Sequence, residues 1–184
     1  EGVMGYYDGF GGKTNFASTH HVATLLDSPV ILILDASKTS RSIAATALGF
    51  TKFHKNSRIS GIILNKIGSK KHEVLCRTAL QNLKIPIIGV IPKNASTNLE
   101  SRHLGLVPIA EQKVLHAKIK QISKEISDYL DFTIIEKICK KTSPINRTKP
   151  IKSKLPKITV AIALDNSFNF YYHDNIEALR REGA

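Results

Sequence analysis

The sequence predicts an α/β protein with a doubly wound, mostly parallel sheet, and two observations lead to this prediction. Three apolar runs of strand length, rich in Val, Ile and Leu, lie in the first half of the chain at residues 29–35, 58–64 and 86–91. Such continuous runs are typical of strands that are buried on both faces. Segments with helical spacing separate the runs, which indicates βαβ units and parallel strands.

The elements follow in order along the chain. A short helix is expected at 15–27, with Ser18 or Thr19 as its N-cap. Two longer helices are expected at 40–53 and 69–83, each between two strands. Residues 109–141 have helical spacing that Asp131 divides into two helices, and a further strand at 157–164 and helix at 175–182 end the chain.

The topology places the candidate site. In doubly wound sheets, ligands bind beyond the carboxyl ends of the strands. This rule points to the loops at 35–40, 65–69 and 92–99, which follow the three strands.

The distribution of charge argues against a nucleic-acid-binding protein. The chain has 184 residues, 42% of them hydrophobic, and a formal net charge of +12. Much of the excess charge lies between Lys137 and Lys157, where basic residues occur without acidic ones and without aromatic residues for base stacking. We therefore interpret residues 142–156 as a solvated basic linker and expect no nucleic-acid partner.

The lack of recognisable targeting segments and the small number of cysteines indicate the expected compartment. No apolar run approaches the ~20 residues that cross a membrane, and no signal peptide is recognisable. Cys76 and Cys139 are the only cysteines, which favours the reducing cytoplasm. Residue 1 is Glu rather than Met, so we expect that the chain does not begin at a natural start.

The first twelve residues, EGVMGYYDGFGG, form a glycine-rich loop whose only charges are Glu1 and Asp8. Carboxylates on such a loop suit a Mg²⁺ ion held against phosphate, although a plain solvated loop explains the composition equally well. The following GGKT resembles the end of a P-loop, but Tyr7 stands where that motif needs its first Gly. We do not interpret it as a P-loop.

Two further positions end predicted strands. Asp35 follows an apolar strand, as the Asp of a Walker B motif does, or it caps the next helix. Asn65-Lys66-Ile67-Gly68 resembles the base-reading loop of GTPases with Gly in place of the guanine-binding Asp, or it is a simple turn. An Asn amide can still donate to and accept from adenine.

Motifs along nearly the whole chain resemble the cobyrinate a,c-diamide synthases. They are EGVMGYYDG, STHHVATLL, PVILILDASKTSRS, GIILNKIGSKKH, ESRHLGL and FNFYYHDNIEALRREGA. Members of this family are ATP- and glutamine-dependent amidases of cobalamin synthesis. The resemblance implies a P-loop NTPase fold of the dethiobiotin synthetase type, joined to a class I glutamine amidotransferase-like domain.

The resemblance also implies a domain organisation. Residues 1–141 would form the ATP-binding synthetase domain, with its P-loop upstream of Glu1. Residues 157–184 would be the first strand and helix of the glutaminase domain, whose catalytic Cys and His would lie beyond Ala184. ATP and Mg²⁺ are the implied cofactors, and cobyrinic acid and glutamine-derived ammonia are the implied partners.

Individual residues take roles from the family motifs. Glu1 would be a catalytic residue and the Mg²⁺ ligand, with Asp35 supporting the metal site, and Asp8 would lie near the carboxylate that is activated. Asn65, Lys66 and Pro92 would bind ATP, flanking adenine. Arg102 and His103 would bind the substrate or a phosphate group, since Arg holds such anions with a planar fork.

Two other functions stay open. One is amidation of a related tetrapyrrole such as nickel-sirohydrochlorin. The other is a non-catalytic nucleotide switch of the partition-ATPase type, which would bind a partner protein or DNA and would carry no glutaminase domain. A homodimer is compatible with each of these functions.

Overall fold

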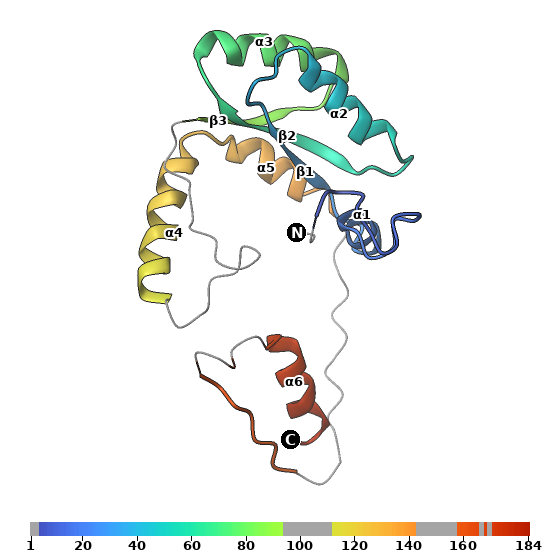
Figure 1. The fold of residues 1–184 in the computed structure, drawn as a ribbon, viewed down its shortest axis with the longest axis vertical. Coiled ribbons are helices and arrows are strands. Elements are labelled where there is room, and N and C mark those ends of the chain that lie inside the picture. The colour runs from blue at the N-terminus through green and yellow to red at the C-terminus, as the bar shows by residue number, and fades with distance from the viewer. Residues whose placement is uncertain (1–3, 94–111, 143–157, 166–167, 169–170) are drawn as a thin grey trace. The chain divides into compact units, whose positions relative to one another are not determined.

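The computed structural model describes residues 4–93, 112–142, 158–165, 168 and 171–184, and for residues 112–116 it describes the backbone alone. Chain contacts divide the protein into two units, Glu1–Thr97 with Ile122–Pro144, and Asn98–Gln121 with Ile145–Ala184. The elements, labelled in Figure 1, are α1 (Thr19–Leu25), β1 (Val30–Asp35), α2 (Ser42–Lys52), β2 (Ile59–Ile67), α3 (Lys70–Leu80), the 3₁₀ helix η1 (Gln81–Leu83), β3 (Ile87–Pro92), α4 (Gln112–Ser127), α5 (Phe132–Cys139) and α6 (His173–Glu182).

The three predicted strands form one parallel sheet in the order β1-β2-β3. Asp35 at the end of β1 lies opposite Asn65 of β2, and Ile67 at the end of β2 lies opposite Pro92 of β3. The α/β fold with a parallel sheet is therefore confirmed. This register brings the carboxyl ends of the strands to a common edge, the carboxyl edge.

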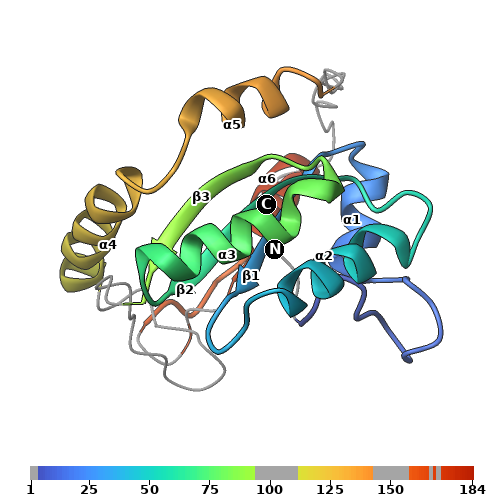
Figure 2. The ribbon, with the colours of Figure 1, turned by 90° about the horizontal axis from the view of Figure 1, so that it is seen from above.

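Helices cover both faces of the sheet, which explains why the strands are apolar throughout. On one face, Ile62 and Leu64 of β2 are fully buried in a cluster with Ile43 of α2 and Leu80 of α3. On the other face, alternate strand residues pack against Ile138 of α5. Figure 1 shows α2 and α3 on one side of the strands with α5 on the other, and Figure 2 shows α2 and α3 lying over the sheet.

The free edge of β3 is covered by the short connection between α4 and α5. Val90 N donates to Tyr129 O at 3.1 Å, and Asp131 N donates to Ile88 O at 2.8 Å. Between these bonds, Gly89 forms an antiparallel bridge with Leu130. A Cβ atom on Gly89 would lie only 2.4 Å from Leu130 Cδ2, so the contact depends on glycine.

The N-terminal loop packs on α1 and α2 through aromatic rings. Tyr6 is buried and donates its hydroxyl to Ser57 O, and Tyr7 donates its hydroxyl to Phe50 O at 2.6 Å. His20 of α1, only 3% exposed, lies with its ring 5.2 Å from that of Tyr7. These contacts attach the glycine-rich loop to the sheet domain.

Side-chain caps begin three of the helices where the sequence indicates. The hydroxyl of Ser18 accepts from His21 N at the start of α1, and the hydroxyl of Ser69 accepts from His72 N at the start of α3. Asp131 Oδ1 accepts from Ile134 N at 3.1 Å and begins α5. The predicted division of residues 109–141 at Asp131 is confirmed.

The predicted strand at 157–164 is wrong for the part of it that the structure describes. Residues 158–164 have no strand pairing, and their side chains are exposed, with Leu164 at 75%. A strand needs a neighbour that pairs with its backbone over several residues. Among the described residues, Ile158 N donates to Gly183 O at 2.9 Å, but no strand pairs with the segment. The expected final helix is confirmed as α6.

Candidate functional site

The carboxyl edge of the sheet carries an ion pair between β1 and β2. Lys66 Nζ lies 2.6 Å from Asp35 Oδ2, and Ser37 N donates to Asp35 Oδ1 at 2.8 Å. Hydrogen bonds from Lys66 and then from Ser37 hold the pKa of Asp35 well below its usual range. Both side chains are half exposed, so the pair contributes mainly to local geometry.

Asn65 and Lys66 belong to the end of β2, because this strand continues to Ile67. The predicted loop at 65–69 is therefore shorter than expected. Lys66 has a φ of 60°, and Asn65 Oδ1 accepts from Lys66 N at 2.9 Å. A side chain that bonds to the next backbone N–H favours this left-handed bend, which turns Lys66 toward Asp35.

His72 joins two of the loops that follow strands, and sequence reasoning assigned it no role. Its Nδ1 accepts from Gly68 N at 3.1 Å, after β2, so its Nε2 carries the hydrogen and donates to Thr39 O at 2.5 Å, after β1. No sequence pattern signals this role, because Thr39 comes close only when the sheet has formed.

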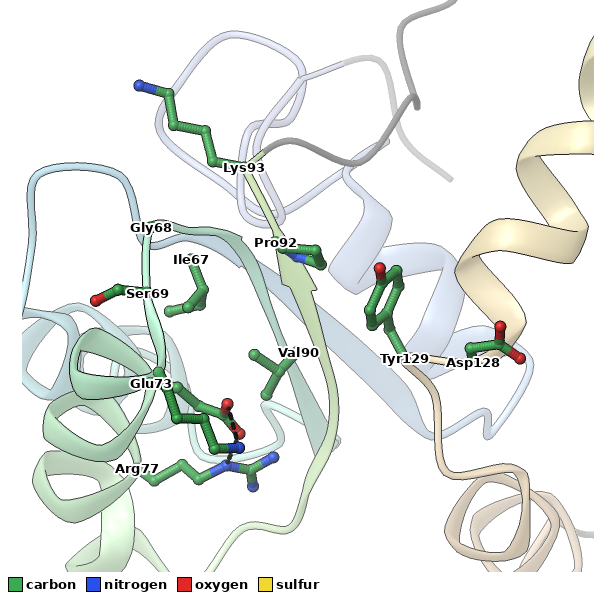
Figure 3. A pocket seen from close by; sticks show the side chains of 11 residues that line it. Ile67, Gly68, Ser69, Glu73, Arg77, Val90, Pro92, Lys93, Asp128 and Tyr129 are labelled. Atoms are coloured by element: carbon green, nitrogen blue, oxygen red, sulfur yellow. Dashed lines mark hydrogen bonds and ion pairs between the residues drawn. The ribbon is translucent and has the colours of Figure 1, made fainter.

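A cavity of about 920 Å³ lies beyond the carboxyl ends of β2 and β3. Ile67, Val90 and Pro92 give it an apolar wall, and Tyr129 lies across from them (Figure 3). Because Tyr129 belongs to the connection between α4 and α5, the edge pairing of β3 also completes the cavity. In the sequence, the predicted division between two helices at Asp131 indicated where the segment that pairs with β3 lies.

The polar wall of the cavity is a charged triad on α3. Glu73 accepts from Lys70 Nζ at 2.9 Å and from Arg77 Nε at 2.8 Å, as the dashed lines in Figure 3 show. The guanidinium of Arg77 and then the ammonium of Lys70 lower the pKa of Glu73. Lys93 and Asp128 also line the cavity, so its lining has more basic than acidic side chains. The first turn of α3 adds backbone N–H groups that favour anions.

The residues predicted from the sequence are not all brought together. Pro92 lines the cavity, whereas Asn65, Lys66 and Asp35 form their own cluster at the same edge. Asp8 accepts from Gly5 N at 2.8 Å in a separate hollow of about 340 Å³ beside α2. Glu1, Arg102 and His103 lie outside the described residues.

The described part of the chain offers neither a metal cluster nor a membrane-spanning helix. There, no three or more His, Cys, Asp or Glu residues are grouped so that they could hold a metal ion. The described helices include none with the length and apolar character needed to cross a bilayer.

Comparison with known proteins extends these observations. The chain is 41% identical over its whole length to the cobyrinate a,c-diamide synthase of Synechococcus sp. and 38% identical to that of Gloeobacter violaceus. It is 34% identical to the hydrogenobyrinate a,c-diamide synthase of Thermobifida fusca. The resemblance stated from the motifs is thus confirmed, and the chain covers 41%, 41% and 42% of the length of these relatives.

Solved structures and family models give further information on the fold. No solved structure matches the chain. The model of the AAA domain family matches residues 1–101, which are more than half of the chain and include the whole parallel sheet. By this match over more than half of its length, the chain belongs to the AAA domain family.

Proposed function

We propose that this chain is the nucleotide-binding part of an ATP- and glutamine-dependent amidase that converts the a and c carboxylates of cobyrinic acid to amides. The observation that carries the proposal is the similarity over the whole chain to relatives named cobyrinate a,c-diamide synthases. Because the chain spans about two fifths of their length, the activity is proposed for the gene product that contains it. The proposed fold type is that of dethiobiotin synthetase.

The cavity at the carboxyl edge fits an adenine nucleotide. Its volume of about 920 Å³ lies in the range of ligand pockets. Val90, Pro92 and Tyr129 would pack on the base, and the N–H groups at the start of α3 would meet phosphate oxygens. Bound ATP would transfer its terminal phosphoryl group to a substrate carboxylate and leave as ADP. Ammonia would then displace phosphate from the acyl phosphate to form the amide.

The chain's own residues would position this chemistry. His72 fixes the loops after β1 and β2 relative to each other, which keeps Ser69 and the start of α3 in place. The Asp35–Lys66 pair keeps both strand ends together. Holding reacting groups in place supplies much of the rate enhancement in phosphoryl transfer. Mg²⁺, Glu1 as its ligand, Asp8 beside the reacting carboxylate, and Arg102 with His103 as anion-binding residues complete the proposal.

The decisive experiment is an amidation assay with the full-length gene product that carries this sequence. Cobyrinate and hydrogenobyrinate are each supplied with ATP, Mg²⁺ and glutamine, and mass spectrometry follows two successive amidations. We expect the a,c-diamide of at least one of them. Nickel-sirohydrochlorin and DNA are supplied in parallel assays. Amidation of nickel-sirohydrochlorin alone would make it the substrate in place of cobyrinate, and nucleotide-dependent binding to DNA without amidation would favour a partition-type switch.

A second test concerns the assignment of Asn65 to adenine. Asn65 does not line the cavity, so a contact with adenine needs the base to reach beyond Val90, Pro92 and Tyr129. With that contact, Asn65→Ala should raise the KM for ATP by an amount that corresponds to about 1–2 kcal/mol, the value of hydrogen bonds lost from a buried base. Asn82→Ala is the matched control, because Asn82 is exposed in η1 before β3 begins. An unchanged KM in Asn65→Ala would leave Asn65 with its local role at the bend of β2.

A further inference from the structure

A second cavity lies at the opposite edge of the sheet, where the strands begin. Its volume is about 540 Å³, and its lining includes residues just before β1, β2 and β3 together with the inner face of α5. Proposed nucleotide binding uses the carboxyl edge, so this amino-edge cavity has no part in it. Its floor is apolar, formed by side chains such as Ile59, Ile85 and Ile138.

The charges around the amino-edge cavity are unbalanced. Four cations line it, namely Arg58, Lys84, Lys137 and Lys141, and the only acid in its lining is Asp27. Arg58 Nη2 lies 2.6 Å from Asp27 Oδ1, so this acid is held by one of the four. No ion pair within the described chain engages the three lysines. The cavity therefore has a positive excess.

The arrangement of α5 concentrates this charge on the cavity. Lys137 and Lys141 are one turn apart on the side that lines the cavity, next to Ile134 and Ile138. Like charges at this spacing weaken a helix end. Lys140 is instead paired with Glu136 at 2.7 Å and does not line the cavity. The neutralised Lys140 thus lies outside the cavity lining, whereas the unpaired Lys137 of α5 and Lys141, just past the end of α5, belong to it.

Arg58 adds a donor that lacks an acceptor. Its Nε is buried and has no hydrogen-bond partner among the described atoms, although its guanidinium also holds Asp27. A buried N–H without an acceptor is unfavourable. Guanidinium groups can offer several donors in one plane to an anion. Arg58 lines the cavity and its side chain is 27% exposed, so the exposed part of the guanidinium is available to an anion there.

We propose that the amino-edge cavity binds a small organic or inorganic anion that carries two or more phosphate groups. Phosphate is favoured because Lys side chains bind it as point charges, and three unpaired lysines surround one cavity. The apolar floor accommodates the carbon framework of an organic phosphate, which gives the cavity room beyond the phosphates themselves. The ligand would bridge α5 to the loops before β2 and β3.

The test measures pyrophosphate binding to the 184-residue chain by calorimetry at constant ionic strength. We expect the double variant Lys137→Gln/Lys141→Gln to weaken binding at least about tenfold, since each charged hydrogen bond contributes a comparable factor. Lys140→Gln removes one charge at the end of α5 but outside the cavity lining, and should change the affinity less than about twofold. Circular dichroism verifies that each variant is folded.

Three results would overturn the proposal. The first is weakening by the Lys140→Gln control that equals the effect per lysine in the double variant, which would show a response to net charge alone. The second is unchanged affinity in the double variant, which would place pyrophosphate elsewhere. The third is citrate binding as tightly as pyrophosphate and with the same dependence on the lysines, which would replace phosphate by carboxylate as the ligand class.

Discussion

The phenol of Tyr6 lies at the centre of the contacts that attach the N-terminal loop. Its ring lies 4.6 Å from that of Tyr7 and 5.5 Å from that of His20, and its hydroxyl donates to Ser57 O. Burial, and then the neighbouring Tyr7, raise the pKa of Tyr6 to about 12, against a smaller opposing effect of Arg58. The folded protein therefore favours the neutral phenol.

This shift gives a prediction at alkaline pH. Below pH 10 the phenol is protonated in both states, so it adds no pH dependence. Between pH 10 and about 12 the unfolded chain releases the proton while the folded protein retains it, so the free energy of unfolding falls by about 1–3 kcal/mol. Tyr6→Phe should be less stable at neutral pH but should lose less stability over this range.

Urea unfolding at several pH values between 8 and 12 measures this effect. Tyr172→Phe is the control, because Tyr172 is 79% exposed. If Tyr6→Phe and the unmodified chain lose stability in parallel between pH 10 and 12, the phenol of Tyr6 is not the group responsible.

The candidate site was predictable at this scale only in part. Position along a strand located Asp35 and Pro92 at the carboxyl edge, since an apolar run shows where a strand ends. The ion pair of Asp35 with Lys66, and the link of His72 to Thr39, depend on which strands become neighbours. The sequence does not give that pairing, so these contacts could not be foreseen.

Among the elements, β3 shows how a single glycine can allow another segment to pair with the edge of a strand. Gly89 lies against Leu130 where a Cβ atom would be only 2.4 Å from Leu130 Cδ2 and 3.2 Å from Tyr129 O. The backbone bonds on either side fix the spacing of the two segments. A larger residue must therefore displace Leu130 or break the bridge.

We expect Gly89→Ala to destabilise the protein by about 1–3 kcal/mol, the usual cost of overpacking. Gly49→Ala is the opposite control, because Gly49 lies within α2 with no atom within 4 Å of an added Cβ. That change should stabilise the protein by about 0.5–1 kcal/mol, since Ala favours helix. Thermal and chemical denaturation measure both. A neutral Gly89→Ala variant would mean that residues 129–131 move away at little cost.

The helices were predicted better than the last strand, and the reason is physical. Helices make their backbone hydrogen bonds locally, so Ser18, Ser69 and Asp131 indicated where α1, α3 and α5 begin. A strand requires a partner from elsewhere in the chain. Residues 158–164 have the β-branched composition of a strand, but composition cannot supply its neighbour.

For the whole molecule, we propose the division into residues 1–141, a basic linker at 142–156 and a C-terminal segment from 157. Trypsin should cut first between Lys140 and Lys157, because this stretch is basic and contains Pro144, Pro150 and Pro156 without apolar periodicity. Short digestion followed by mass spectrometry identifies the first fragments. First cuts within residues 29–91 would show that the proposed boundary is wrong.

The cover of β3 also has a consequence for the nascent chain. β1, β2 and β3 can pair as soon as Pro92 has left the ribosome, but the segment from Tyr129 to Asp131 follows later. At about 5–20 residues per second, this interval lasts for seconds. Among the described residues, no other segment pairs with the outer edge of β3, so during this interval another nascent chain could bind its N–H and C=O groups. Protection from aggregation during synthesis therefore depends on how quickly the connection between α4 and α5 reaches the sheet.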